Sequence, residues 1–227
     1  MINAFTIVLC LVGMLIQLVF IYSEYRNNMF AAVWLKGLAA AVFVWVGFRG
    51  LQYAGQSRFA DTVVTGLVLG AIGDVFLNIR YLTKKYEQLF FIGGIISFFM
   101  GHVMYLISMI PYCDQTAFVL IAGITITLVL YVLTWRTIKA NKVLMVFGAI
   151  YIPGVVFMAV AAMGNLISVQ NTNRVIFAIG ALFFLVSDII LIFNTFGPKH
   201  RFPLSALTLV LYYIGQSLIA CSVGYLP

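Results

Sequence analysis

Charged residues are scarce in this chain: Lys, Arg, Asp and Glu together make up 8% of its 227 residues, against roughly 25% in an average soluble domain. Hydrophobic residues make up 64%, and a soluble fold of this length could not bury that much apolar surface. The excess must face lipid, so the composition predicts an integral membrane protein. It excludes a disordered tail and a disulfide-stapled secreted domain. The net charge of +7 does not indicate a nucleic acid as partner, because the basic residues fall between hydrophobic runs.

Cysteine is scarce as well, and Cys10, Cys113 and Cys221 lie far apart in the chain. The sequence has no Cys-x-x-Cys pair and no cluster of His and Cys, so we expect no metal site. We expect ordinary thiols in apolar surroundings. One disulfide on the outer side of the membrane is the alternative.

Long hydrophobic runs, by contrast, are plentiful. Eight have the roughly 17–25 residues of a membrane-spanning helix: residues 3–22, 31–50, 61–79, 89–110, 116–135, 143–163, 174–196 and 203–225. Charged or turn-forming residues separate them. The sequence therefore predicts an all-α, multi-pass protein of the cell membrane, with residues 1–227 forming one transmembrane helical bundle domain. The first run lacks a basic segment before it and a cleavage site after it, so we expect a retained helix. We expect Pro203 in the first turn of the last helix and a kink at Pro153.

The basic residues are distributed unevenly between the two sides that these spans define. By the positive-inside rule the richer side is cytoplasmic, so both termini are predicted on the non-cytoplasmic side. The richer side receives Arg26, Lys36, Arg80, Lys84, Lys85, Arg136, Lys139, Lys142, Lys199 and Arg201, and the other side receives Arg49, Arg58 and Arg174.

Two acidic residues lie inside the predicted spans, Asp74 in the third and Asp188 in the seventh. Counted from the cytoplasmic helix ends at 1.5 Å per residue, they lie about 8 Å and about 12 Å deep, so they can share one level. A carboxylate inside the membrane is costly and by default marks a functional site. The alternative is a structural pair that only joins two helices.

Two desolvated carboxylates that lie close together cannot both ionise easily, so one would keep its proton. An acid beside a base is the equipment for general acid–base hydrolysis. The same pair also suits a proton-coupled transporter. Asp74 and Asp188 are therefore the candidate catalytic residues.

Further polar residues in the spans can complete a site, although each can equally make a simple interhelical hydrogen bond. They form sets that share a helix face: Asn78 with Asp74, His102 with Tyr105, and Tyr212 with Gln216. By depth His102 lies nearer the outer half, which makes it a less direct partner of Asp74. Lys36 and Arg80, near cytoplasmic helix ends, either hold a phosphate head group or only set the topology.

Small residues accompany the first of these acids. Gly66, Gly70 and Gly73 precede Asp74, and Gly93, Gly94 and Gly101 lie in the next span. Small residues let membrane helices approach closely, so we expect the third and fourth helices to pack tightly.

Four segments, in order, resemble the YhhN-type lysoplasmalogenase family. Gly73-Asp74 opens the first, and Phe91, Gly94, Phe98, His102 and Tyr105 have the family's spacing F-x-x-G-x-x-x-F-x-x-x-H-x-x-Y. The segments 180–188 (GALFFLVSD) and 212–219 (YYIGQSLI) resemble the family's seventh and last helices. Lys36 lies where the family often has Lys-Pro, but Gly37 replaces the proline.

The resemblance implies an eight-helix enzyme that hydrolyses the vinyl ether of a lysoplasmalogen, a membrane lysophospholipid, without a metal or other cofactor. The products are a fatty aldehyde and glycerophosphoethanolamine or glycerophosphocholine. It implies Asp74 and Asp188 as the catalytic residues. The substrate-binding residues would be Asn78, His102, Tyr105, Tyr212 and Gln216, with Lys36 and Arg80 at the head group.

Two other functions use intramembrane acids. A proton-coupled transporter of a small solute or lipid would use the pair as a relay, although the sequence shows no two related halves. An intramembrane aspartyl protease is disfavoured for two reasons. Ala71 replaces the first glycine of the Gly-x-Gly-Asp motif in Ala71-Ile72-Gly73-Asp74. Asp188 follows this segment in the chain, whereas the partner Asp precedes it in these proteases.

Overall fold

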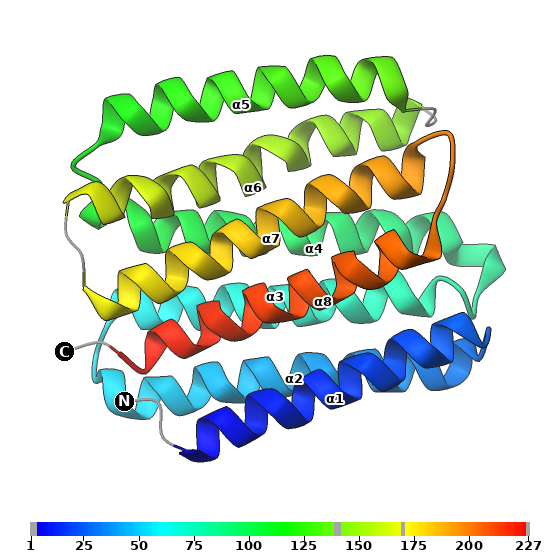
Figure 1. Cartoon of the computed structure of the whole chain (residues 1–227), viewed down its shortest axis with the longest axis horizontal. Helices are drawn as coiled ribbons and strands as arrows, with labels where there is room; N and C mark the ends of the chain where they lie inside the picture. The colour runs from blue at the N-terminus through cyan, green and yellow to red at the C-terminus, as the bar shows by residue number, and fades with distance from the viewer. Residues whose placement is uncertain (1–3, 139–141, 169–170, 226–227) are drawn as a thin grey trace.

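The computed structural model describes residues 4–138, 142–168 and 171–225 (Figure 1). Within these ranges the chain forms eight long helices, each long and apolar enough to cross a membrane, which confirms the predicted class and number of spans. They are α1 (Ala4–Tyr25), α2 (Met29–Ala54), α3 (Arg58–Ile79), α4 (Glu87–Met109), α5 (Thr116–Thr137), α6 (Lys142–Ser168), α7 (Thr172–Phe196) and α8 (Phe202–Val223), with single turns η1 (Lys84–Tyr86) and η2 (Ile110–Tyr112) beside α4.

The helix ends follow local chemistry. Ser57 caps α3 by accepting a hydrogen bond from the Ala60 N–H, as its short hydroxyl side chain favours. The α2 helix continues past Arg49, where the sequence predicts an end, because the guanidinium lies against the rings of Phe5 and Tyr53 and does not break the helix. It stops at Gly55, whose φ of +61° suits glycine.

Two prolines are expected to shape helices: Pro203 at the start of the last helix and Pro153 inside the sixth. Proline lies in the first turn of α8, as predicted. Pro153 lies inside α6, which continues as one helix from Lys142 to Ser168. Proline has no N–H to offer the carbonyl four residues earlier, and the hydroxyl of Tyr131 on α5 donates to that carbonyl, of Ala149. The contact therefore gives the Ala149 carbonyl oxygen the hydrogen-bond donor that Pro153 cannot supply.

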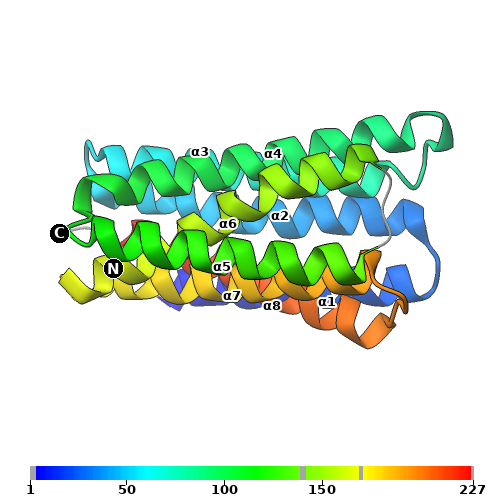
Figure 2. The same ribbon diagram turned by 90° about the horizontal axis from the view of Figure 1, so that it is seen from above.

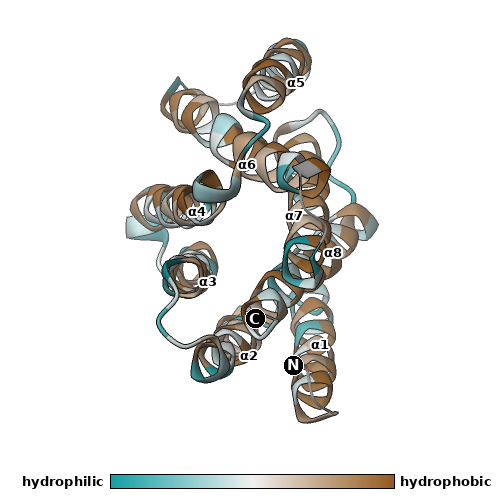
Figure 3. Ribbon diagram, turned by 90° about the vertical axis from the view of Figure 1, so that its left-hand side faces the viewer, coloured by the Kyte–Doolittle hydropathy of each residue, from teal (hydrophilic) through white to brown (hydrophobic). Residues whose placement is uncertain are grey.

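Six helices form a closed ring. Each packs on the next in the order α2, α3, α4, α6, α7, α8 and back to α2, and α3 also touches α8. Outside the ring, α1 packs on α2 and α8, and α5 packs on α6, as the end-on view in Figure 3 shows. Seen from above, α6 runs obliquely from α4 toward α7 (Figure 2). The outer faces carry exposed apolar side chains such as Leu11, Ile121 and Trp135, as expected of a surface that meets lipid.

Glycines let neighbouring ring helices touch. A Cβ at Gly101 of α4 would lie 3.1 Å from the Gly66 carbonyl oxygen of α3, and one at Gly180 of α7 would lie 2.8 Å from the Gly215 carbonyl oxygen of α8. The close packing that the sequence predicts for α3 and α4 is therefore present, and α7 and α8 repeat it.

Two of the three cysteines are neighbours in space. The Sγ atoms of Cys10 on α1 and Cys221 on α8 lie 3.8 Å apart, although 211 positions separate them in the sequence. All three cysteines are free thiols in this structure.

The bundle has one basic end. The connections α1–α2, α3–α4 and α7–α8 lie at the end opposite to the first turn of α1 and the last turn of α8 (Figure 1). Nine of the ten basic residues predicted to be cytoplasmic belong to this half, and the tenth, Lys139, lies outside the described residues.

This arrangement tests the predicted topology. A reporter inserted between Lys84 and Glu87 should be cytoplasmic, and one fused after the last residue should be external, because the positive-inside rule fixes the basic end. Accessibility of single-cysteine labels in intact cells gives an independent reading. External labelling at 84–87 would overturn the charge count.

Candidate active site

Asp74 of α3 is held in a buried ion pair. The Nζ of Lys36 on α2 lies 3.3 Å from Asp74 Oδ1, and the two residues are only 2% and 4% exposed. The hydroxyl of Tyr212 on α8 donates to Oδ2 at 2.8 Å. The Tyr212 ring centroid lies 4.4 Å from Lys36 Nζ, a cation–π contact. Both carboxylate oxygens thus face groups that favour the ionised form.

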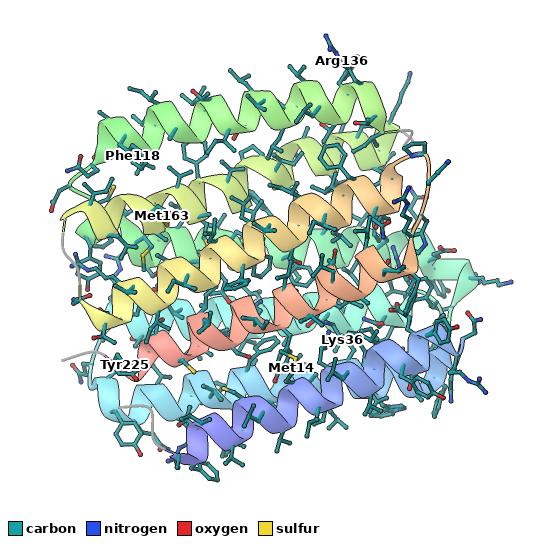
Figure 4. The ribbon with its side chains drawn as sticks, viewed as in Figure 1. Met14, Lys36, Phe118, Arg136, Met163 and Tyr225 are labelled. Atoms are coloured by element: carbon teal, nitrogen blue, oxygen red, sulfur yellow. The ribbon has the colours of Figure 1, made fainter. Side chains whose placement is uncertain are left out.

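Figure 4 shows Lys36 among the side chains at the meeting of α1, α2 and α8. It lies seven residues after the start of α2, and the ring of Phe20 on α1 lies 5.3 Å from its Nζ. The ammonium group is therefore committed to Asp74 inside the bundle.

A second polar chain holds Asp188 of α7. The hydroxyl of Tyr151 on α6 donates to Asp188 Oδ2 at 2.5 Å. His102 Nε2 on α4 lies 3.0 Å from the same hydroxyl and 3.8 Å from Oδ2. His102 is 1% exposed and Asp188 4%. His102, which depth counting separates from Asp74, is thus a partner of Asp188.

The hydroxyl between them restricts where the protons lie. Tyr151 has one hydrogen to donate. While it donates to an ionised Asp188, the shared contact with His102 requires a proton on Nε2. If Asp188 is protonated, it can donate to Tyr151, which then donates to His102. The chain can therefore hold a proton at either end.

Tyr105 and Gln216 form a layer behind Tyr212. The Tyr105 hydroxyl donates to Gln216 Oε1 at 2.7 Å, and Gln216 Nε2 donates to the Tyr212 hydroxyl at 3.4 Å. The hydrogen of Tyr212 is then directed to Asp74. Glycines make room for this layer, because a Cβ at Gly66 would lie 2.4 Å from the Tyr105 ring and one at Gly70 would lie 2.6 Å from Gln216 Nε2.

Both carboxylates line one cavity of about 210 Å³. Its polar lining comes from Lys36, Asp74, Asn78, Arg80, Tyr151, Asp188 and Tyr212, with Glu24, Tyr81, Ser187, Thr195 and Thr208. Apolar side chains such as Leu77, Ile95 and Leu191 make up much of the rest. His102, Tyr105 and Gln216 stand behind this wall. Six of the nine predicted site residues thus line the cavity. His102 and Gln216 each reach a carboxylate through one tyrosine hydroxyl, and Tyr105 binds Gln216.

Asn78 and Arg80 lie at the basic end of α3. Asn78 Nδ2 donates to the Asp74 carbonyl oxygen at 2.9 Å, so its amide supports the helix and not the carboxylate. The Arg80 guanidinium lies 4.6 Å from the Tyr81 ring and 4.4 Å from the Phe91 ring. Its Nε is buried and has no hydrogen-bond partner among the described residues.

Tyr151 is the site residue that the sequence reasoning missed. A tyrosine in an apolar span is unremarkable among 12 tyrosines. Depth is the signal that could have found it: Tyr151 follows the start of α6 by nine residues and Asp188 precedes the end of α7 by eight. At 1.5 Å per residue both lie about 12–14 Å deep.

No group of three His, Cys, Asp or Glu side chains that could hold a metal ion occurs in the described part of the chain. The fold and the site therefore define a polytopic helical membrane protein whose cavity carries two buried carboxylates in different surroundings. Comparison with known proteins identifies the family. Residues 29–223 match the YhhN family, and the chain belongs to it.

One curated relative is similar across most of the chain. Human lysoplasmalogenase TMEM86A is 29% identical over 182 residues, which cover 77% of this chain and 70% of the relative. No solved structure matches the chain significantly.

The chain of Tyr151, His102 and Asp188 predicts a coupled loss of stability. Tyr151→Phe leaves a buried carboxyl and a buried imidazole without their shared partner, and we expect it to cost about 1–3 kcal/mol of unfolding free energy. Tyr22→Phe, which removes a hydroxyl from an exposed tyrosine, is the control.

Unfolding in detergent, followed for Tyr151→Phe, Asp188→Asn and the double variant, measures the coupling. Because the two residues share one hydrogen bond, the double variant should lose less stability than the two single losses together. Strict additivity would show that the contact contributes nothing.

Proposed function

We propose that this chain is a lysoplasmalogenase, which hydrolyses the vinyl ether of a lysoplasmalogen to a fatty aldehyde and a glycerophospho head group. The observation that carries the proposal is the pair of buried carboxylates on one cavity, one beside the Nζ of Lys36 and one beside the Tyr151 hydroxyl and the His102 imidazole. The family membership and the name of the human relative support the choice of substrate.

The surroundings of the two acids suggest their roles. Asp74 faces the Lys36 ammonium and the Tyr212 hydroxyl, which both favour its carboxylate form. Asp188 has no Lys or Arg within 4.0 Å in the described ranges, and desolvation favours its neutral form. We therefore assign Asp188 as the proton donor and Asp74 as the base.

The reaction then balances with water as its one co-reactant. Asp188 gives its proton to the outer alkene carbon, and the π electrons leave an oxocarbenium ion at the carbon that bears oxygen. Water attacks that carbon and passes a proton to Asp74, forming a hemiacetal. The hemiacetal hydroxyl returns a proton to Asp188, the bond to the glycerol oxygen breaks, and Asp74 protonates that oxygen. The aldehyde and alcohol leave, and both acids are restored.

The other site residues serve these steps. Asp74 and its neighbour Tyr212 place negative charge and a polar hydroxyl beside the developing cation. The Tyr151 hydroxyl holds Asp188 and links it to His102, which can share its proton. Thr208 lines the cavity, is 3% exposed, and its hydroxyl has no partner among the described residues. It is suited to a hydroxyl of the glycerol.

Purified protein incubated with a lysoplasmalogen and with the matching lysophospholipid ester tests the activity. We expect mass spectrometry to detect fatty aldehyde from the first and no fatty acid from the second, because the proposed acid protonates an alkene carbon. Solute uptake by proteoliposomes without product formation would instead favour the transporter.

Removing either titrating proton tests the mechanism. Asp188→Asn keeps the shape of the side chain, and we expect turnover to fall at least about 10²-fold, since acid–base steps typically contribute 10²–10⁴-fold. Asp74→Asn should lose as much. A double variant should be barely worse than either single one, because the residues act as a unit.

Stability must be measured on the same samples. Asp74→Asn leaves Lys36 buried without a counter-charge, which typically costs about 3–5 kcal/mol. The pair variant Lys36→Met with Asp74→Asn removes both charges and should recover stability but not turnover. Near-normal turnover per folded molecule in Asp188→Asn or in the pair variant would refute the mechanism.

A further inference from the structure

The proposed reaction leaves one acidic residue of the cavity unused. The chain has six Asp and Glu residues, and three of them, Glu24, Asp74 and Asp188, line this single cavity. Asp74 and Asp188 lie deep in the bundle. Glu24 is the next-to-last residue of α1, so it lies at the basic end, where the cavity meets the helix ends.

Glu24 faces the cavity through the register of α1. Phe20 and Glu24 are four residues apart and share a face of the helix, and both line the cavity. Phe20 is fully buried against Lys36, and Glu24 is half-buried one turn nearer to the helix end. α1 thus contributes an apolar wall beside the ion pair and a carboxylate above it.

The carboxylate of Glu24 has no close partner among the described residues. It takes part in neither ion pair, and no hydrogen bond to its side chain is formed there. Lys36, Arg80 and His200 are the basic groups that interact with it electrostatically, but Lys36 is committed to Asp74. The Arg80 guanidinium contacts the rings of Tyr81 and Phe91 and donates from Nη2 to the Tyr81 hydroxyl. The half-buried carboxyl group of Glu24 therefore lines the same cavity as a guanidinium whose buried Nε has no partner among the described residues.

We propose that Glu24 and Arg80 together bind a zwitterionic head group, with Glu24 binding its amine and Arg80 its phosphate. The inference rests on the proposed function, which places a lysophospholipid in this cavity. A guanidinium suits a phosphate, and a carboxylate suits an ammonium group, through charge-assisted hydrogen bonds. An anionic head group without an amine would instead meet repulsion at Glu24.

The residue proposed to select an amine-bearing head group, Glu24, belongs to α1. The family match begins at Met29, so α1 lies outside it, whereas Asp74, Asp188 and Arg80 lie inside it. The reaction residues and the residue that distinguishes the head group thus belong to different parts of the chain.

A comparison of two substrates isolates the amine. 1-Alkenyl-lysophosphoethanolamine carries it, and 1-alkenyl-glycerophosphate lacks it. We expect Glu24→Gln to lower kcat/KM for the first roughly tenfold, mainly by raising KM, as expected for loss of a hydrogen bond to a charged group. The second should be cleaved as well as before or better. Glu87→Gln removes an exposed acid at the same end of the bundle, outside the cavity lining, and should change neither.

Charge reversal and charge retention provide further checks. Glu24→Lys should invert the preference and favour the substrate without the amine, whereas Glu24→Asp should keep most of the wild-type preference. An equal loss with both substrates, or no change with either, would overturn the role of Glu24.

A binding measurement separates this inference from the proposed function. If wild-type protein releases no aldehyde, the proposed reaction has failed, but the non-hydrolysable 1-alkyl ethers with and without the amine can still be compared. Affinity in detergent should then fall about tenfold in Glu24→Gln for the amine-bearing ether alone. Equal affinities of the wild type and Glu24→Gln for that ether would refute the head-group site, whatever the reaction is.

Discussion

The buried ion pair between Lys36 and Asp74 is the contact on which the site depends. Two charges that are almost wholly shielded from solvent are tolerated only while each compensates the other. To shield them, the bundle must close α2 on α3 and bring α8 across both. Tyr212 completes the enclosure, since its hydroxyl binds the carboxylate and its ring faces the ammonium group. The packing of α2, α3 and α8 and the charge environment of Asp74 therefore depend on the same contacts.

Asp188, unlike Asp74, has no lysine beside it among the described residues. Asp188 has a hydroxyl and an imidazole as neighbours, and both can give or accept a proton. A low-dielectric interior penalises an unpaired charge there. Two chemically identical side chains thus have different surroundings, set by Lys36 of α2 and Tyr151 of α6, and the proposed roles of base and acid rest on that difference.

The sequence predicted the eight spans and both acids, because lipid imposes a simple rule on every residue that faces it. Length and hydropathy define the helices, and an acid that breaks the rule is conspicuous. Tyr151 was not predicted as a site residue, because a tyrosine is an ordinary residue in a membrane-spanning helix. The sequence also placed Lys36 at the head group, but its partner could be found only by knowing that α2 lies against α3. Depth counting, which paired the two acids, gave no information about which helices are neighbours.

The ring explains why the polar residues can exist in a bilayer at all. Each described residue of the two polar chains lies on a ring helix, and in the described ranges α5 contributes nothing to the cavity lining. α1 is outside the ring and still contributes, because it covers the seam between α2 and α8 with Phe20. Without that cover Lys36 would face lipid, where its charge would be costly. A helix that must lie over the seam for this reason also presents its next turn, with Glu24, to the cavity entrance. One face of α1 therefore carries both Phe20, which shields the ion pair, and Glu24, which we propose binds the amine of the head group.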